Sequence, residues 1–118
     1  MFARHRRLRL SSGIRDLVRE TVLTPMDFIY PVFVVEGKNI KHEISTLPGN
    51  YHYSVDRLPE VIDEVRKAGV RGILLFGIPG YKDEIASSAF DADGVVQKAV
   101  RRVKESAPEL VVITDVCM

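Results

Sequence analysis

DRLPEVIDEVRKAGVRGILLFG, residues 56–77, is the stretch that decides the fold. Its first half predicts an amphipathic helix, because apolar residues recur at three-to-four spacing over residues 58–68. Asp56 is the expected N-cap, and Gly69 is expected to end the helix as the residue after the C-cap. The second half, residues 72–77, is a continuous apolar run that predicts a short strand buried on both faces. A helix that leads directly into a buried strand is typical of a parallel α/β sheet.

Two more apolar runs flank this unit and predict a βαβαβ order, hence a parallel sheet with right-handed crossovers. Pro108 is expected to stop the last helix, and Asp91 or Asp93 to cap its start. The loops after the first two strands are long for simple connectors, which favours loops that shape a site. The expected elements are a strand over 28–35, a polar, hairpin-like excursion over 40–47, a helix over 56–68, a strand over 72–77, a helix ending before Pro108 and a strand over 110–116.

The first 24 residues are expected to form a separate region. Residues 1–10 contain four arginines and a histidine with few apolar residues, which predicts an extended arm. Ser11 or Ser12 is expected to cap a short helix with an apolar stripe from Ile14 to Val22, ended by the Thr24-Pro25 pair. Without interleaved aromatic residues, the arginine cluster predicts a solvated or subunit-contacting arm rather than a phosphate-binding one. The expected organisation is therefore an arm with a helix, residues 1–24, followed by an α/β region, residues 25–118.

The composition is that of a soluble globular protein and excludes several classes of function. Seventeen basic residues oppose 16 acidic ones, so a net charge of +1 gives no case for binding nucleic acid or a membrane surface. No apolar run approaches the roughly 18–20 residues that a membrane span needs, and no secretory signal is recognisable. The single cysteine excludes an internal disulfide and fits a reducing, cytoplasmic location.

The candidate chemistry lies at the end of the last predicted strand, which carries Asp115 and Cys117. Both side chains point to the same face because they are two residues apart along a strand. The carboxyl ends of parallel strands are where α/β proteins build active sites. Cys117 alone cannot hold zinc, which needs three or four ligands, and a buried structural cysteine is the plain alternative. Since such a site would be cut in half, we expect a piece of a larger enzyme.

Other polar residues give weaker signals. Asp115 faintly resembles the phosphoacceptor of a response-regulator receiver domain, but the first strand is followed by one acid, Glu36, where receivers carry an acidic pair. His5, His42 and His52 show no metal-ligand spacing. The loop lysines are expected to be solvated, and the glycines match no phosphate-binding fingerprint.

Taken in order along the chain, several stretches are similar to the N-terminal third of the 5-aminolevulinate dehydratase (porphobilinogen synthase) family. They cover nearly all 118 residues, so the resemblance is specific, although no single piece would suffice. The matching stretches are Arg6–Arg9, Ile14–Thr21, Asp27–Val34 followed by Glu36-Gly37, Ile44, Leu47–Gly49, Gly72–Pro79, Lys82-Asp83 and Thr114–Cys117.

The resemblance implies a TIM (β/α)8 barrel, here incomplete: its first three strands, preceded by the N-terminal arm and helix. It implies an arm that embraces a neighbouring subunit in a homo-oligomer, commonly an octamer. It also implies a lyase that condenses two 5-aminolevulinate molecules into porphobilinogen for tetrapyrrole and heme biosynthesis. Two lysines on later strands form Schiff bases with the substrates in this family.

The same resemblance assigns roles to the two candidate residues. Zinc-type members hold a catalytic Zn²⁺ with three cysteines that begin in a D-x-C-x-C motif. Cys117 would be the first ligand of that metal, and Asp115 would face the substrate pocket. The other two cysteines and both Schiff-base lysines would lie beyond Met118, so we expect the isolated chain to be inactive. Two alternatives stay open: a non-catalytic α/β signalling module with Asp115 as phosphoacceptor, and a folding or assembly unit without its own ligand.

Overall fold

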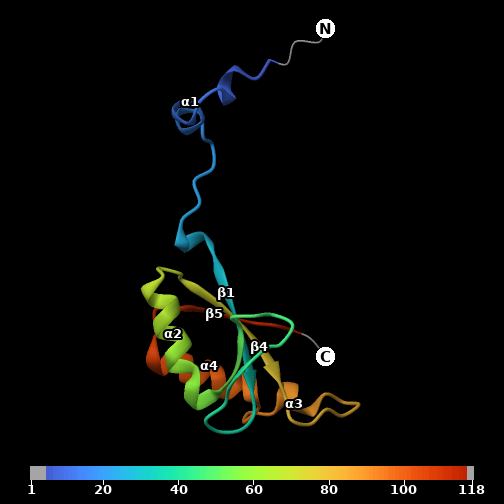
Figure 1. Ribbon diagram of the computed structural model, residues 1–118. Coiled ribbons are helices and arrows are strands. Elements are labelled where there is room, and N and C mark those ends of the chain that lie inside the picture. The colour runs from blue at the N-terminus through green and yellow to red at the C-terminus, as the bar shows by residue number, and fades with distance from the viewer. Residues whose placement is uncertain (1–4, 117–118) are drawn as a thin grey trace.

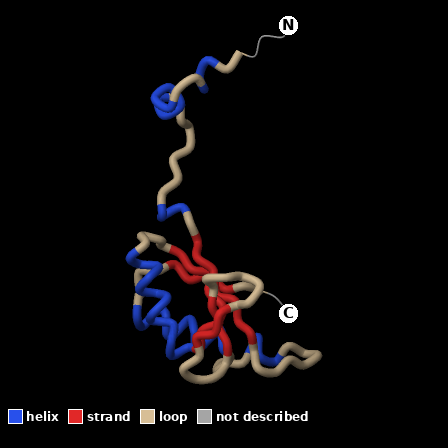
Figure 2. Tube along the Cα trace, in the orientation of Figure 1, coloured by secondary structure: helices blue, strands red, loops and turns tan. Residues whose placement is uncertain are grey.

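The computed structural model of the chain describes residues 5–116, whose body is a single sheet with helices packed on one face (Figures 1 and 2). Five strands lie in the order β2-β3-β1-β4-β5. β1 pairs in parallel with β3 and β4, β4 pairs in parallel with β5, and β2 and β3 are antiparallel. The strands are β1 (Ile29–Val35), β2 (Lys41–Glu43), β3 (Tyr51–Ser54), β4 (Gly72–Ile78) and β5 (Val111–Thr114). The α-helices are α1 (Ser12–Leu17), α2 (Leu58–Lys67), α3 (Ser87–Phe90) and α4 (Val95–Ser106).

The α/β class and the order of the three parallel strands β1, β4 and β5 agree with the prediction, but the strand count does not. The predicted polar excursion over 40–47 contains β2, but β3 lies outside it and was not predicted. The two strands form a hairpin, and β3 pairs in parallel with β1 at the register Phe33↔His52 to Val35↔Ser54. The Ser54 hydroxyl helps to hold this hairpin, because it accepts a hydrogen bond from the Ile40 amide at 2.8 Å. The sequence alone did not indicate this hairpin, because β2 is only three polar residues long and β3 only four residues long.

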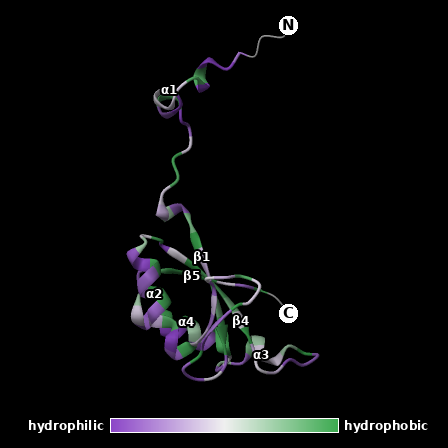
Figure 3. Cartoon of the chain, in the orientation of Figure 1, coloured by the Kyte–Doolittle hydropathy of each residue, from purple (hydrophilic) through white to green (hydrophobic). Residues whose placement is uncertain are grey.

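The hydrophobic core lies between the sheet and the helices α2 and α4 (Figure 3). Alternate residues of β1 and β4 point into it, so the prediction of strands buried on both faces is wrong for the described residues. Ile29 at the start of β1 is 54% exposed, and Val111 at the start of β5 is 57% exposed. The fully buried large side chains are Val32, Val34, Leu58, Val61, Ile62, Ile73, Leu75, Val103 and Leu110.

Helix α2 begins differently from the prediction and ends as predicted. Gly69 follows the C-cap with φ +81°, the left-handed conformation that favours glycine at this position. Asp56 does not cap the helix; it lies in a 3-10 turn, and Arg57 occupies the N-cap. The Asp56 carboxylate instead accepts a hydrogen bond from the Asn39 amide at 2.9 Å. Asp56 therefore binds the Asn39 amide, which is distant in the sequence, instead of the nearby amides at the start of α2 that the sequence suggested.

Neither predicted aspartate caps α4, whose N-cap is Gly94 with no side-chain hydrogen bond. Asp93 pairs with Arg101 at 2.9 Å, and Asp91 accepts a hydrogen bond from the Asp93 amide. Gly94 is closely packed, since a Cβ there would lie 2.6 Å from the Ser88 carbonyl oxygen. The close approach of α3 selects glycine at this cap.

Residues 5–24 extend away from the sheet (Figure 1). Ser11 caps α1 as predicted, because its hydroxyl accepts a hydrogen bond from the Ile14 amide at 3.3 Å. The helix ends at Leu17 rather than near Thr24, and the Leu17 side chain is 86% exposed. An apolar stripe without a packing partner does not sustain a long helix, because most helical stability comes from tertiary contacts. Within residues 5–116, no helix is long and apolar enough to cross a membrane.

Candidate functional site at the carboxyl edge of the sheet

The face of the sheet opposite α2 and α4 carries an aromatic pair beside the strand ends. Phe33 of β1 and Phe76 of β4 are register partners. Their rings stack with the ring centroids 5.3 Å apart and an interplanar angle of 19°. His52 of β3 packs edge-on against Phe33, with ring centroids 6.2 Å apart. Their strand neighbours Val34 and Leu75 are buried on the helix side, so the three rings lie on the open face.

Asp115 lies at this edge, directly after β5. Its amide donates a hydrogen bond to the Leu75 carbonyl oxygen at 3.2 Å, which extends the pairing of β5 with β4 by one residue. Continuing the register Leu75↔Thr114 places Asp115 beside Phe76, with its exposed side chain on the open face. Cys117, the predicted partner of Asp115, lies outside the described residues.

The loop that follows β1 is held in place by hydrogen bonds to Asp56 and Arg57, which lie just before α2. Gly37 and Asn39 adopt positive φ angles of 115° and 56°, a conformation that few other residues tolerate. Arg57 donates a hydrogen bond to the Asn39 side-chain oxygen at 2.8 Å. Hydrogen bonds from the Ser54 hydroxyl and the Asn39 amide hold the pKa of Asp56 below its usual range. The loop therefore has a defined shape at the carboxyl end of β1.

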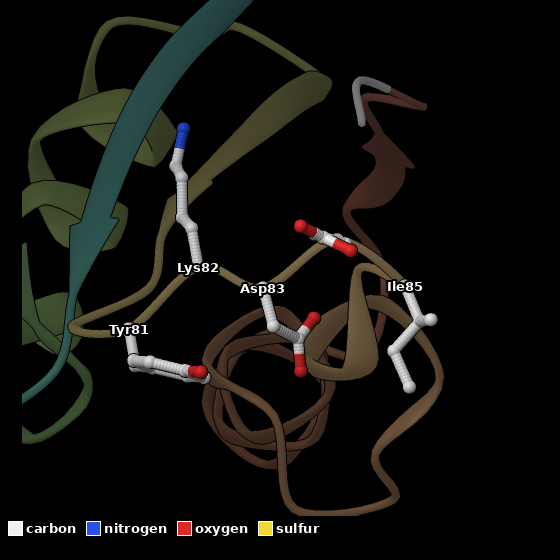
Figure 4. Close-up of a pocket in the computed structure, with 5 residues that line it drawn as sticks. Tyr81, Lys82, Asp83 and Ile85 are labelled. Atoms are coloured by element: carbon white, nitrogen blue, oxygen red, sulfur yellow. The ribbon is translucent and has the colours of Figure 1, made fainter.

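The loop that follows β4 forms a shallow depression lined by residues 81–85 (Figure 4). Lys82 and Asp83 point to opposite sides of this loop. Asp83 accepts hydrogen bonds from the hydroxyl and the amide of Ser87, which hold its pKa below the usual range. Lys82 is exposed, as predicted for a solvated loop lysine. Asp83 thus holds the start of α3, and this depression offers no buried catalytic group among its lining residues.

The two loops meet at the carboxyl edge of the sheet. A Cβ on Gly80 would lie 2.8 Å from a carboxylate oxygen of Glu36, so these two residues lie close together. Glu36 follows β1 and Gly80 follows β4, which brings both loops to the edge where Asp115 also lies. This convergence is the arrangement that parallel sheets use for active sites.

No group of three histidine, cysteine, aspartate or glutamate side chains comes close enough to hold a metal ion between residues 5 and 116. A metal site with three such ligands at this edge would need at least one side chain from outside the described residues. The aromatic pair Phe33 and Phe76 was not predicted as part of the site, although alternation along each strand places these residues opposite the core-facing ones. This alternation could have identified the two phenylalanines from the sequence. It was not used, because both faces of each strand were expected to be buried.

Comparisons with known proteins identify a family for this chain. The sequence profile of the family described as delta-aminolevulinic acid dehydratase matches residues 2–118. Curated proteins of that name include one from Ruminiclostridium josui, 49% identical over all 118 residues and over 58% of its own length. Another, from Bacillus subtilis strain 168, is 45% identical over 99% of this chain and 36% of its own length. The chain thus spans less than two thirds of these relatives.

A solved structure agrees with the sequence comparison. It is the crystal structure of delta-aminolevulinic acid dehydratase (porphobilinogen synthase) from Toxoplasma gondii ME49 in complex with the reaction product porphobilinogen. The two chains superpose with a TM-score of 0.84 at 30% sequence identity, over 98% of this chain and 33% of the other.

Proposed function

The chain belongs to the delta-aminolevulinic acid dehydratase family, and from this membership we propose that it supplies the first part of a porphobilinogen synthase. That enzyme is a lyase that condenses two 5-aminolevulinate molecules into porphobilinogen, a step of tetrapyrrole and heme biosynthesis. The observation that carries the proposal is the similarity over 98% of this chain to a structure with porphobilinogen bound.

The proposed architecture is a partial TIM barrel. Residues 25–118 would contribute the parallel strands β1, β4 and β5, with α2 and α4 as outer helices, and residues 1–24 would form the arm. Helices cover one face of the sheet, and the opposite face carries Phe33 and Phe76. In a closed barrel this open face would become the packed interior, and the carboxyl edge with Asp115 would lie at the catalytic end.

In the proposed reaction, the residues of this chain would line only the part of the substrate pocket at the carboxyl edge of its sheet. Asp115 would face the substrate, where its carboxylate can accept hydrogen bonds from the amino group of an aminolevulinate. Phe33 and Phe76 would form an apolar floor beneath it. The two lysines that form Schiff bases with the substrates would come from later strands, so the isolated chain would be inactive.

The donor set only partly fits the zinc ion that the family resemblance implies. Cys117 would be one zinc ligand, and Asp115 lies two residues before it in the expected D-x-C arrangement. Within residues 5–116, no three histidine, cysteine, aspartate or glutamate side chains form a group that could hold a metal ion. When bound in a complete site, zinc would act as a Lewis acid toward the second substrate.

The zinc content of the purified chain tests this assignment. After dialysis against a chelator and then metal-free buffer, we expect well below one zinc per chain, because one thiolate cannot replace three ligands. Elemental analysis of the chain and of Cys117→Ser gives the comparison. One tightly held zinc per chain, lost in Cys117→Ser, would show that 118 residues already form a complete site.

We further propose that the arm makes contacts between copies in a homo-oligomer. Residues 1–24 carry six arginines and two acidic residues, whereas residues 25–118 carry eleven basic and fourteen acidic ones. A basic arm and an acidic body are electrostatically complementary between copies. The described part of the arm also exposes several large apolar side chains, which are Leu8, Leu10, Leu17, Val18, Val22 and Leu23.

Sedimentation at two salt concentrations tests the role of the arm. We expect an oligomer at low salt and a smaller species near 1 M salt, where the screening length falls to about 3 Å. Charge reversal at Arg6, Arg7 and Arg9 is expected to weaken the oligomer, whereas Lys98→Glu on the exposed side of α4 serves as the matched control. A monodisperse monomer of the full chain at low salt contradicts the proposal.

A chimera tests the proposed function as a whole. The 118 residues are joined to the remainder of the Bacillus subtilis relative, and porphobilinogen formation from 5-aminolevulinate is measured. We expect the chimera to be active, and the 118-residue chain and the remainder alone to be inactive. A folded chimera without activity, or stoichiometric acyl-phosphate labelling of Asp115, would favour the signalling alternative or an assembly unit instead.

A further inference from the structure

The hairpin β2-β3 brings two histidines together that are ten residues apart in the sequence. His42 and His52 are direct register partners in this antiparallel pair. Directly opposite residues have Cβ atoms about 4.5–5.5 Å apart, and their side chains lie on the same face of the sheet. The spacing of the histidines along the sequence did not indicate this juxtaposition, because it arises from the turn between the two strands.

The charged neighbours of the hairpin lie on its other face. The Lys41 ammonium sits 5.0 Å from the ring centroid of Tyr51 and 5.6 Å from that of Tyr53, and 3.7 Å from Glu60 of α2. These contacts place Lys41 on the helix side, where Tyr53 is buried. Strand alternation then places His42 on the open face, away from the lysine charge.

Both imidazoles are available to a ligand. His52 is partly buried with its ring edge-on to Phe33, which restricts the ring's orientation. His42 is exposed, and no hydrogen bond to either imidazole is present within residues 5–116. The ring nitrogens are therefore not committed to another group of the described chain.

We propose that His42 and His52 form a two-imidazole binding site for a late first-row divalent cation, such as Ni²⁺ or Zn²⁺. Imidazole is a preferred ligand of these metals, with metal–nitrogen distances of about 2.0–2.1 Å for zinc. Two nitrogens about 3 Å apart on one cation are within reach of side chains whose Cβ atoms are about 5 Å apart. In this chain, where none of residues 5–116 covers the open face, water would fill the remaining coordination positions, and the site is distinct from the one at Cys117.

Titration with NiCl₂ tests the site in the full chain. The variant Cys117→Ser serves as the background, which removes thiolate binding. We expect one Ni²⁺ per chain by calorimetry and a higher Tm in its presence, because the cation cross-links β2 to β3. His42→Asn and His52→Asn are each expected to weaken binding by about tenfold or more and to abolish the Tm rise. His5→Asn in the arm is the matched control and leaves both readouts unchanged.

A second measurement tests the site without the His52→Asn variant, which could fail to fold because His52 packs against Phe33. Paramagnetic Ni²⁺ should broaden the imidazole NMR signals of His42 and His52 before that of His5. The proposal is overturned if His42→Asn, whose side chain is exposed, binds Ni²⁺ as tightly as the background. Preferential broadening of His5, or a stoichiometry of one Ni²⁺ per two chains, overturns it as well. None of these outcomes affects the family assignment, which the activity of the chimera tests separately.

Discussion

Asp115→Asn in the chimera is expected to lower kcat for porphobilinogen formation by about 100-fold, the order of loss seen when one positioned electrostatic contact is removed from an active site. The carboxylate lies at the carboxyl edge of the sheet, beside the stacked pair Phe33 and Phe76. Asparagine has nearly the same size but lacks the negative charge that an amino group of the substrate would meet. Steady-state kinetics with 5-aminolevulinate measure the effect.

Asp63→Asn is the matched control for this substitution. Asp63 is an exposed carboxylate on the outer side of α2, with only a 3.8 Å contact to Arg66. Its replacement should leave kcat within the error of the parent chimera. Equal activity of Asp115→Asn and Asp63→Asn would remove Asp115 from the proposed pocket, whereas equal loss would indicate a general effect on folding.

Leu75→Ala is expected to destabilise the chain by about 2–5 kcal/mol, the usual cost of removing a fully buried leucine. Leu75 is 0% exposed between the sheet and the helices. Leu74, one residue earlier, lies on the open face of the same strand, opposite Pro31 of β1 and Ile113 of β5. Leu74→Ala should cost at most about 1.5 kcal/mol, because a partly exposed leucine loses less apolar contact.

Urea unfolding of Leu75→Ala, Leu74→Ala and the parent chain, at one protein concentration, measures the change in the free energy of unfolding for each variant. The same pair in the chimera tests the barrel proposal directly. If the remaining strands close over the open face, the cost of Leu74→Ala should rise towards that of Leu75→Ala, because both leucines are then buried. A Leu74→Ala cost that stays unchanged in an active chimera would contradict a packed interior at this position.

Local patterns in the sequence determined most of the elements. Continuous apolar runs identified β1, β4 and β5, and the three-to-four spacing identified α2 and α4. Gly69 was correctly predicted to end α2, because a left-handed residue after a helix is a local requirement of the backbone. Of the two serines predicted as possible caps, Ser11 caps α1, again through a local contact, because its hydroxyl accepts a hydrogen bond from the Ile14 amide three residues later.

Several of the wrong predictions depend on contacts between residues that are not adjacent in the sequence. Asp56 was expected to cap α2, and Asp91 or Asp93 to cap α4. Asp56 and Asp93 instead pair with residues that are more distant in the sequence, Asn39 and Arg101 respectively, whereas Asp91 binds the nearby Asp93 amide. A carboxylate binds whichever donor the fold brings closest, and local spacing does not report such donors. The prediction that the strands are buried on both faces was wrong for a similar reason, because burial of the second face depends on which other part of the protein covers it.

The sequence by itself determined the α/β class, the three parallel strands, the resemblance to the family and the position of Asp115 at a strand end. These features follow from local periodicity and from the order of motifs along the chain. Only the tertiary structure decided that β3 pairs with β1, that Phe33 and Phe76 stack on the open face, and that His42 lies opposite His52. Register between strands depends on turns and long-range packing, which local patterns do not encode.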